Sequence, residues 1–264
     1  MIFLGVLNSD VFVLTQKDKV GFLKKIVSVF EEFDVDYWLE FGTLLGCYRD
    51  NRLISWDSDL DFGVFDIDAV RNVKSHLEKK GLFVEEKPNN FMPTLEIKSV
   101  DFPEESYFHA DVFQFVKNLE GGYEYNWLVR TNIFCRIANY ISYFFRQERV
   151  VNASKARVKL TDDIISVTKK FPKSINKMLH SVFFNMDLFF SHNRKLLFKD
   201  FVTKPLEVYG VKMRIPETVE EHLLLNYGKN WQTPMQTTQT GGCEFISEIK
   251  GGVELCRLPE EYYE

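Results

Sequence analysis

The sequence predicts an α/β (α+β) fold, in which a mixed sheet is flanked by helices and the second half of the chain is mainly helical. The first 120 residues alternate segments of helical apolar spacing with short segments rich in aromatic and β-branched residues. Residues 132–147 carry an apolar stripe at helical spacing, and a further helix is expected over 174–191. With 264 residues, 45% of them hydrophobic, the chain is long enough to bury a core.

The elements of the first half are expected as an alternation of helices and strands. Thr15 is the N-cap expected for the first helix, and a Gly42-Thr43 turn leads from the first strand into a short second helix. In order, the expected elements are helix 16–33, strand 35–41, helix 43–50, strand 60–65, a helix from Ile67 to Gly81, and strands 82–86, 94–100 and 109–116.

The remaining residues are expected to complete the same globular unit. We predict residues 1–120 as an α/β core and residues 121–264 as a helical and C-terminal region that completes the substrate pocket. Strand-like pieces near 206–213 precede a helix over 218–227, which ends at Gly228. No repeat or low-complexity linker is visible between the two regions.

Composition narrows the function and the location. The net charge of −5 does not provide the broad basic surface of a general nucleic-acid binder, so no nucleic-acid partner is expected. Cys47, Cys135, Cys243 and Cys256 form no CxxC pair, which fits a reducing compartment. Residues 1–14 lack the basic start of a signal peptide, and no apolar run reaches the ~20 residues of a membrane span. A soluble, cytoplasmic protein is therefore expected.

Three carboxylates alternate along the chain at Asp57, Asp59 and Asp61. If a strand starts near Leu60, alternate side chains face one side of it, so the like charges need a cation between them or ample water. Asp111 lies in another expected strand, and pairing of the two strands would bring it beside Asp59 and Asp61. A metal site is the favoured interpretation, and an exposed acidic strand or loop is the ordinary alternative.

A calcium-binding loop is the main rival explanation for these acids. Its sixth position needs Gly for a sharp turn, and Phe62 stands there instead. Residues 60–65 also have the pattern of a strand, so the calcium loop is not favoured. His109 lies close to Asp111 in the sequence and is assigned a structural role.

The Gly42-Thr43 turn adds a second element to the predicted site. It lies between a strand and a helix start, where the backbone N–H groups of Thr43 and Leu44 can face an anion. Taken alone, it reads as an ordinary glycine turn. A phosphate-binding turn beside a metal site indicates phosphoryl or nucleotidyl transfer.

Two blocks of residues together resemble a known family. The first block reads Trp-Leu-Glu-Phe-Gly-Thr-Leu-Leu-Gly at 38–46, then Arg49, then Trp-Asp-Ser-Asp-Leu-Asp at 56–61. The second block consists of Ile215, Pro216, Glu221, Leu224, Tyr227, Gly228, Trp231 and Pro234. Together they are similar to the LicD and fukutin family, a branch of the nucleotidyltransferase (DNA polymerase beta-like) superfamily. The sequence departs from the family pattern at Cys47-Tyr48 and at Ser58.

The resemblance implies a metal-dependent phosphotransferase. Its donor would be CDP-linked, its acceptor a hydroxyl of a glycan or lipid-linked glycan, its cargo phosphocholine, ribitol phosphate or a similar group, and its by-product CMP. Mg²⁺ or Mn²⁺ would be the cofactor, with catalytic residues Asp59, Asp61 and Asp111 and metal ligands Asp59, Asp61, Asp111 and Asp57. The implied substrate-binding residues are Gly42, Thr43, Leu44, Arg49, Tyr227 and Trp231.

Alternatives remain open at this point. One is a nucleotidyltransferase that attaches NMP from NTP to a protein or a small molecule, and another is a non-catalytic module that kept the fold for binding. Arg49 can also be a surface ion-pair residue, and Tyr227 and Trp231 can be a helix end and a core aromatic. The apolar stripe at 132–147 reads as core, but with the Lys/Arg-rich stretch 146–180 it allows a peripheral membrane contact.

Overall fold

The computed structural model describes residues 14–87, 92–103, 108–118, 122–129, 133–146, 163–199, 201–234, 246–250, 253–259 and 262. The chain divides into two compact units. One consists of residues 1–117 with 200–242, and the other of residues 118–199 with 243–264. The boundary at 117 lies close to the predicted 120. However, residues 200–242 return to the first unit, so the predicted division into 1–120 and 121–264 is wrong in its second part.

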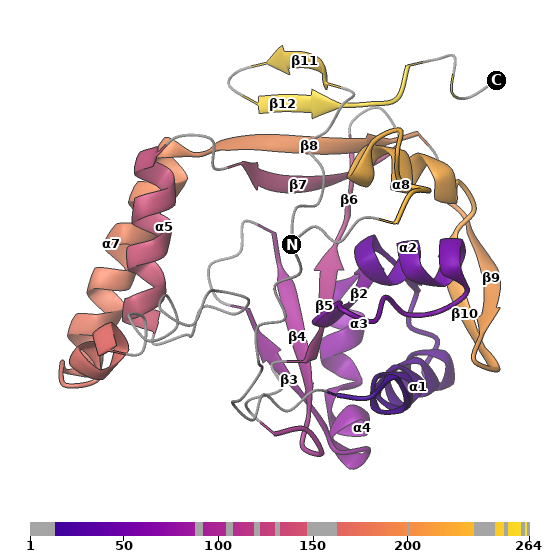
Figure 1. Ribbon diagram of the computed structural model, residues 1–264, viewed down its shortest axis with the longest axis horizontal. Coiled ribbons are helices and arrows are strands. Elements are labelled where there is room, and N and C mark those ends of the chain that lie inside the picture. Colours follow the sequence, from indigo (N-terminus) through magenta and orange to yellow (C-terminus); the bar gives the residue numbers. More distant parts are fainter. Residues whose placement is uncertain are drawn as a thin grey trace, which may run out of the picture. The chain divides into compact units, whose positions relative to one another are not determined.

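A five-stranded sheet forms the centre of the first unit (Figure 1). Its order is β1-β2-β5-β4-β3. The neighbours β2 and β5 are parallel, and the other pairs are antiparallel. The strands are β1 (Tyr37–Leu39), β2 (Asp59–Val64), β3 (Leu82–Glu86), β4 (Thr94–Ser99) and β5 (His109–Gln114). All five strands expected in the first half are present, and the α/β fold class is confirmed.

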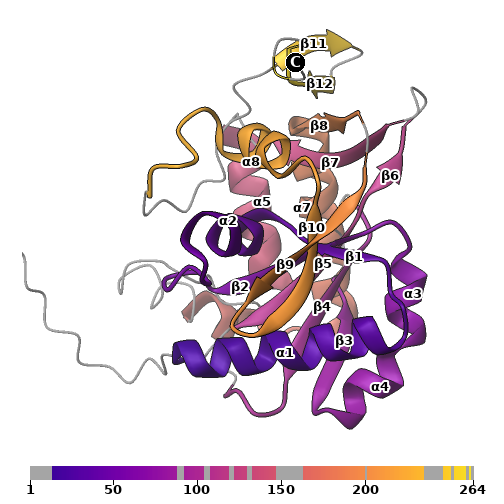
Figure 2. The ribbon, with the colours of Figure 1, turned by 90° about the vertical axis from the view of Figure 1, so that its right-hand side faces the viewer.

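Three helices pack against this sheet (Figure 2): α1 (Gln16–Glu32), α3 (Ile67–Asn72) and α4 (Lys74–Lys79). Thr15 caps α1 as expected, because its side chain accepts from the Asp18 N–H while the Asp18 carboxylate accepts from the Thr15 N–H. The helix predicted up to Gly81 is divided in two at Val73. The core includes Phe30, Leu23 and Ile26 of α1, which are fully buried.

Helix α2 (Phe41–Asp50) follows β1 directly and begins two residues earlier than predicted. Phe41 has a φ of 43°, a conformation that L-residues seldom adopt, and this sharp turn carries the chain from strand to helix. Gly63 of β2 packs against the indole of Trp38 so closely that any side chain there would overlap the ring.

The returning segment adds a hairpin and a helix to the first unit. These are β9 (Thr203–Val208), β10 (Val211–Pro216) and α8 (Val219–Tyr227). The buried side chains of Met213, Ile215 and Leu223 belong to the same core as the sheet. Gly228 ends α8 with a φ of 73°, as the sequence predicted for that glycine.

The second unit combines two helices with strands that the sequence did not predict. Helices α5 (Ile133–Arg146) and α7 (Lys173–Phe190) pack against one another and confirm both expected helices. The second five-stranded sheet has the order β11-β12-β8-β7-β6. Its strands are β6 (Val116–Lys117), β7 (Tyr123–Val129), β8 (His192–Phe198), β11 (Ile246–Lys250) and β12 (Val253–Cys256). The second half is therefore less helical than expected.

Cysteine usage also departs from expectation. Cys47 and Cys135 are buried and form no disulfide bond. Cys256 is disulfide-bonded. The spacing of the cysteines did not predict this bond.

Candidate active site

The parallel pairing of β2 with β5 places the predicted carboxylates together. In this register Asp61 lies opposite Asp111, and Asp59 lies opposite His109. Residues opposite one another on neighbouring strands point to the same side of the sheet. The expectation that a neighbouring strand brings Asp111 beside Asp59 and Asp61 is thus met by the structure.

The two faces of β2 differ as the sequence predicted. Leu60 and Phe62 are 1% and 0% exposed and face the core. Asp61 is only 7% exposed on the other face, and Asp59 is half-buried. Because Phe62 lies inside a strand, the calcium-loop alternative does not fit the structure.

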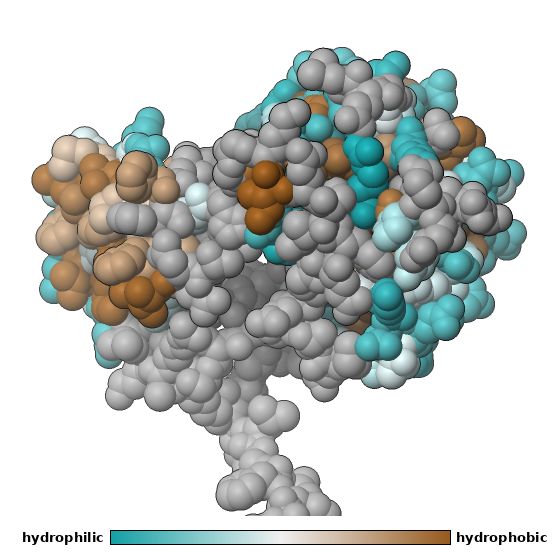
Figure 3. Space-filling view, turned by 90° about the horizontal axis from the view of Figure 1, so that it is seen from above, coloured by the Kyte–Doolittle hydropathy of each residue, from teal (hydrophilic) through white to brown (hydrophobic). Residues whose placement is uncertain are grey.

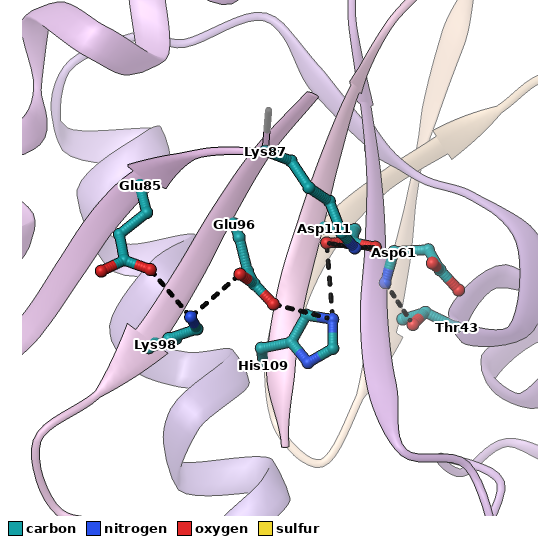
Figure 4. A network of polar contacts seen from close by, with 8 residues as sticks. All are labelled: Thr43, Asp61, Glu85, Lys87, Glu96, Lys98, His109 and Asp111. Carbon is teal, nitrogen blue, oxygen red and sulfur yellow. Dashed lines mark hydrogen bonds and ion pairs between the residues drawn. The ribbon is translucent and has the colours of Figure 1, made fainter. Parts of the chain in front are cut away.

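The first turn of α2 makes hydrogen bonds with Asp61, so these groups are not left available to bind an anion. The N–H of Gly42 donates to Oδ2 of Asp61 at 3.1 Å. The N–H of Asp61 donates in turn to Oγ1 of Thr43 at 2.8 Å (Figure 4). A Cβ at position 42 would overlap Oδ2 of Asp57 and lie 3.5 Å from Oδ2 of Asp61. A side chain at position 42 would therefore displace the Asp57 carboxylate, whereas its contact with Asp61 would be an ordinary one.

Leu44 does not have the role that the sequence analysis assigned to it. Its N–H donates to the carbonyl of Glu40 at 3.0 Å, so this amide is not available to a phosphate. Its side chain is 0% exposed and belongs to the core. The prediction failed because α2 begins at Phe41, which makes position 44 the first to close a helical hydrogen bond.

Burial and like charge together raise the pKa of two carboxyls. Burial, then the neighbouring Asp59, raises the pKa of Asp57 to about 7, although the Ser58 N–H donates to its Oδ1 at 3.1 Å. Burial, then Asp59 and Asp57, raises the pKa of Asp61 well above its usual range. Carboxyls in this state lack a sufficient counter-charge, and a bound cation would lower both pKa values.

Asp111 is electrostatically different because a lysine lies on it. Nζ of Lys87 donates to Oδ1 and Oδ2 of Asp111 at 2.9 and 2.7 Å. Burial alone would raise the pKa of Asp111, but hydrogen bonding to His109 and the charge of Lys87 outweigh it and hold that pKa below its usual value. These neighbours therefore favour the ionised form of Asp111.

Figure 4 shows that this pair continues as a chain of contacts across β5, β4 and β3. Nε2 of His109 lies 3.5 Å from Oδ1 of Asp111 and 3.4 Å from Oε1 of Glu96. Nζ of Lys98 then contacts Glu96 at 3.0 Å and Glu85 at 2.8 Å. Acidic and basic groups alternate, so each carboxylate has a cationic or imidazole neighbour.

Sequence reasoning missed both lysines of this region. Lys87 follows β3, which is two strands away from β5, so only the strand order reveals its contact with Asp111. Lys19 is 7% exposed, and its Nζ donates to the carbonyls of Ser55 and Asp57 at 3.1 and 2.6 Å. Lys19 thus fixes the loop that carries Asp57. His109 lies two residues before Asp111 in the same strand, and this spacing could have placed its imidazole in the predicted site.

Arg49 and Trp231 contact each other rather than the carboxylates. Arg49 pairs with the carboxylate of its neighbour Asp50 at 2.7 Å and donates to the carbonyl of Trp231 at 3.1 Å. It therefore ties α2 to the turn after α8, and the predicted pairing with a diphosphate has no support in this arrangement. For Tyr227, burial, then the charges of Asp61 and Asp57, raises the pKa of the hydroxyl well above its usual value.

Comparison with known proteins shows which protein family part of this chain matches. Residues 34–142 match the family model described as LicD/FKTN/FKRP, nucleotidyltransferase domain. These residues form a LicD-family domain. The matched range begins before β1 and contains all four acids of the carboxylate cluster, Asp57, Asp59, Asp61 and Asp111.

Relatives of the LicD-family domain include the ribitol 5-phosphate transferase FKRP from Mus musculus and from Homo sapiens. Each is 32% identical to this chain over 92 residues, which is 34% of this chain and 19% of the relative. The match thus spans about a fifth of the length of these relatives. Among solved structures, the antibiotic-resistance factor ANT(2'')-Ia is similar at 15% identity and a TM-score of 0.33, covering 64% of this chain and 92% of that one. Lincomycin-bound LnuA is similar at 19% identity and a TM-score of 0.29, covering 57% of this chain and 96% of that one.

The donor atoms of the LicD-family domain fit a hard divalent cation. Ligand atoms of Asp59, His109 and Asp111 lie within 4.8 Å of one another. The raised pKa values of Asp57 and Asp61 show that the same region concentrates negative charge. Carboxylate oxygens are the ligands preferred by Mg²⁺ and Mn²⁺, and an imidazole also suits softer metals. A narrow recess beside these acids, too tight to admit a water molecule, is lined by Lys19, Gly42, Thr43, Leu53, Ile54, Asp57, Asp59, Leu60 and Phe108.

A fully buried carboxylate, that of Glu40, lies next to the LicD-family site and connects α8 to it. Glu40 is 0% exposed and accepts hydrogen bonds from Nε1 of Trp38 at 2.7 Å and from Nδ2 of Asn226 at 3.2 Å. Nδ1 of His222 lies 2.9 Å from the same carboxylate. The N–H of Glu40 donates to the carbonyl of Asp61 at 3.1 Å. Helix α8, which carries Glu221, Leu224 and Tyr227 of the second block, therefore contacts the first block at Glu40 through His222 and Asn226.

Proposed function

We propose that this chain is a metal-dependent phosphotransferase that moves a phosphorylated alcohol from a CDP-linked donor to a hydroxyl of a glycan and releases CMP. One observation carries the proposal: Asp61 and Asp111 lie opposite one another on parallel strands, with Asp59 and Asp57 beside them. Such a cluster is suited to metal-assisted transfer of a charged phosphoryl group. The name of the FKRP relatives, ribitol 5-phosphate transferase, supports ribitol phosphate as one candidate cargo. Phosphocholine is a second candidate, which only the family resemblance implies.

The metal would be Mg²⁺ or Mn²⁺, held by Asp59, Asp61 and Asp111, with Asp57 as a further ligand or a neighbour of the ligands. When bound, it would neutralise charge on the diphosphate and on the departing CMP. The Gly42 amide and the Thr43 hydroxyl keep Asp61 oriented for this role. Tyr227 would form part of the wall beside the acids.

The reaction joins the acceptor oxygen to the phosphorus of the cargo phosphate and breaks the bond from that phosphorus to the oxygen of CMP. The acceptor hydroxyl must lose its proton in this step. Asp57 or Asp111, whichever does not hold the metal, would accept it. Lys87 would add positive charge beside the transferred group.

The test is a turnover screen of the full chain with CDP-ribitol, CDP-choline and CDP-glycerol, with Mg²⁺ and with Mn²⁺, measuring CMP. We expect metal-dependent release of CMP with one of them, and we expect Asp61→Asn to abolish it while the protein stays folded by its thermal unfolding curve. Release of pyrophosphate from an NTP, with no CMP from any CDP donor, would establish the alternative NMP-transfer reaction and refute the proposal.

A further inference from the structure

Helix α7 of the second unit exposes an apolar stripe. Ile175, Met178, Val182 and Met186 are 41%, 57%, 48% and 42% exposed. At about 100° per residue these four side chains lie within an arc of about 80°, along about 16 Å of helix. Figure 3 shows hydrophobic side chains gathered over α5 and α7. A helix of a soluble protein usually turns such a stripe toward its core, so exposure on this scale marks an interaction surface.

Positive charge surrounds the end of the helix pair at which α7 begins. We call residues 167–178 the hairpin end. It exposes the apolar side chains of Val167 and Phe171, at 52% and 42%, together with Ile175 and Met178. From 164 to 186 the sequence has no Asp or Glu and four lysines, all exposed: Lys169, Lys170, Lys173 and Lys177.

The placement of the lysines decides how this surface would approach a partner. Lys173 and Lys177 lie on the side of α7 opposite Ile175 and Val182, by the same 100° spacing. A helix lying flat on its apolar stripe would hold these two ammonium groups away from the surface. An approach by the hairpin end instead buries Val167, Phe171 and Ile175 and brings Lys169 and Lys170, which lie between Val167 and Phe171 in the sequence, to the same surface.

We propose that the hairpin end docks the protein on an anionic lipid bilayer, with apolar side chains entering the interface and the four lysines meeting lipid headgroups. Apolar burial and Lys attraction act additively at such a surface. A second copy of this chain is a poorer occupant, because a symmetric contact would face four lysines with four others. Among the residues the structure describes, no helix is long and apolar enough to cross a membrane.

The test is co-sedimentation of the full chain with vesicles of phosphatidylcholine containing phosphatidylglycerol, compared with phosphatidylcholine alone. We expect binding only to the anionic vesicles, and a loss of binding at high salt. Lys169→Glu with Lys170→Glu should weaken binding at least about tenfold. The matched control, Lys24→Glu with Lys212→Glu, makes the same charge change at exposed positions elsewhere and should leave binding within about twofold.

The apolar contribution is tested separately with Phe171→Ser and Ile175→Ser, against Val100→Ser, a valine that is 66% exposed in the first unit. All the substituted side chains are exposed, and thermal unfolding verifies that each variant folds. The proposal is overturned if the folded chain ignores anionic vesicles, or if the control variants weaken binding as much as the hairpin-end variants. Equal binding to uncharged vesicles, or self-association that Phe171→Ser abolishes without any vesicle binding, would overturn it as well.

Discussion

Replacing Gly42 with alanine should separate the stability of the domain from its metal chemistry. The added Cβ would overlap Oδ2 of Asp57 and approach Cγ of Asp57 to 3.4 Å and Oδ2 of Asp61 to 3.5 Å. The second and third of these distances are ordinary contacts, so only the Asp57 carboxylate must rotate away. Gly21 in α1 provides the matched control, because a Cβ there meets nothing within 4 Å.

The stability effects should nearly cancel at position 42. Alanine in place of glycine in a helix contributes about 0.5–1 kcal/mol. Displacement of Asp57 removes its hydrogen bond from Ser58, at a cost of about 0.5–1.5 kcal/mol. We expect the free energy of unfolding of Gly42→Ala to stay within about 1 kcal/mol of wild type. Gly21→Ala should gain the helix contribution of about 0.5–1 kcal/mol without a cost.

Metal binding should change much more. A hydrogen bond or contact to a charged oxygen contributes about 1.5–3 kcal/mol, so displacing Asp57 should weaken Mn²⁺ binding by about tenfold to a hundredfold. Calorimetric titration measures this directly, and CMP release should fall with it. If Gly42→Ala binds Mn²⁺ and turns over as Gly21→Ala does, then Asp57 does not contribute to the site and the reasoning from the close approach at Gly42 is wrong.

Three further predictions follow from the charges of the first unit. Lys87→Met should tighten Mn²⁺ binding, because it removes the ammonium group that competes with the metal for Asp111, and it should lower the rate of CMP release. Weaker Mn²⁺ binding in this variant would contradict the assignment of Asp111 as a metal ligand. The pKa of Asp57 is raised to about 7 in the folded chain from about 3.9 in the unfolded chain, so the stability that its protonated form contributes is complete below pH ~4 and is lost as pH rises through ~7. Asp57→Asn should therefore raise the melting temperature at pH 8 but not at pH 4. A pH series of thermal unfolding scans measures this. Glu40→Ala should cost about 3–5 kcal/mol in urea unfolding, because Trp38 and Asn226 would lose a fully buried acceptor; a cost below 1 kcal/mol would show that the network adds little.

The acidic strand could be predicted from the sequence because its signal is local. Alternation of Asp59 and Asp61 with Leu60 and Phe62 determines which side chains share a face, whatever the neighbouring strands are. Asp111 was predicted from the same alternation, together with the assumption that its strand lies next to β2. That assumption holds because β2 and β5 are neighbours at the centre of the sheet.

The parts that could not be predicted depend on long-range pairing or on unusual backbone. Lys87 reaches Asp111 only through the order β5-β4-β3. Phe41 adopts a positive φ that its residue type does not favour. The prediction therefore started α2 too late and left the Leu44 N–H without its helical hydrogen bond. Strand β8 reads His-Asn-Arg-Lys-Leu-Leu-Phe, with polar and apolar halves instead of alternation, and its partners β7 and β12 are distant in the chain.

The contact of Glu40 with His222 has a consequence for how the protein is made. During synthesis, Glu40 leaves the ribosome long before His222 and Asn226, and residues 118–199 of the second unit are produced in between. The first unit cannot close around this carboxylate until the chain has grown past α8. A fragment that stops at residue 117, or at the end of the matched range at 142, would leave a charge in its core without its partners. Fragments intended to fold should therefore include α8 and extend to Trp231, whose carbonyl binds Arg49.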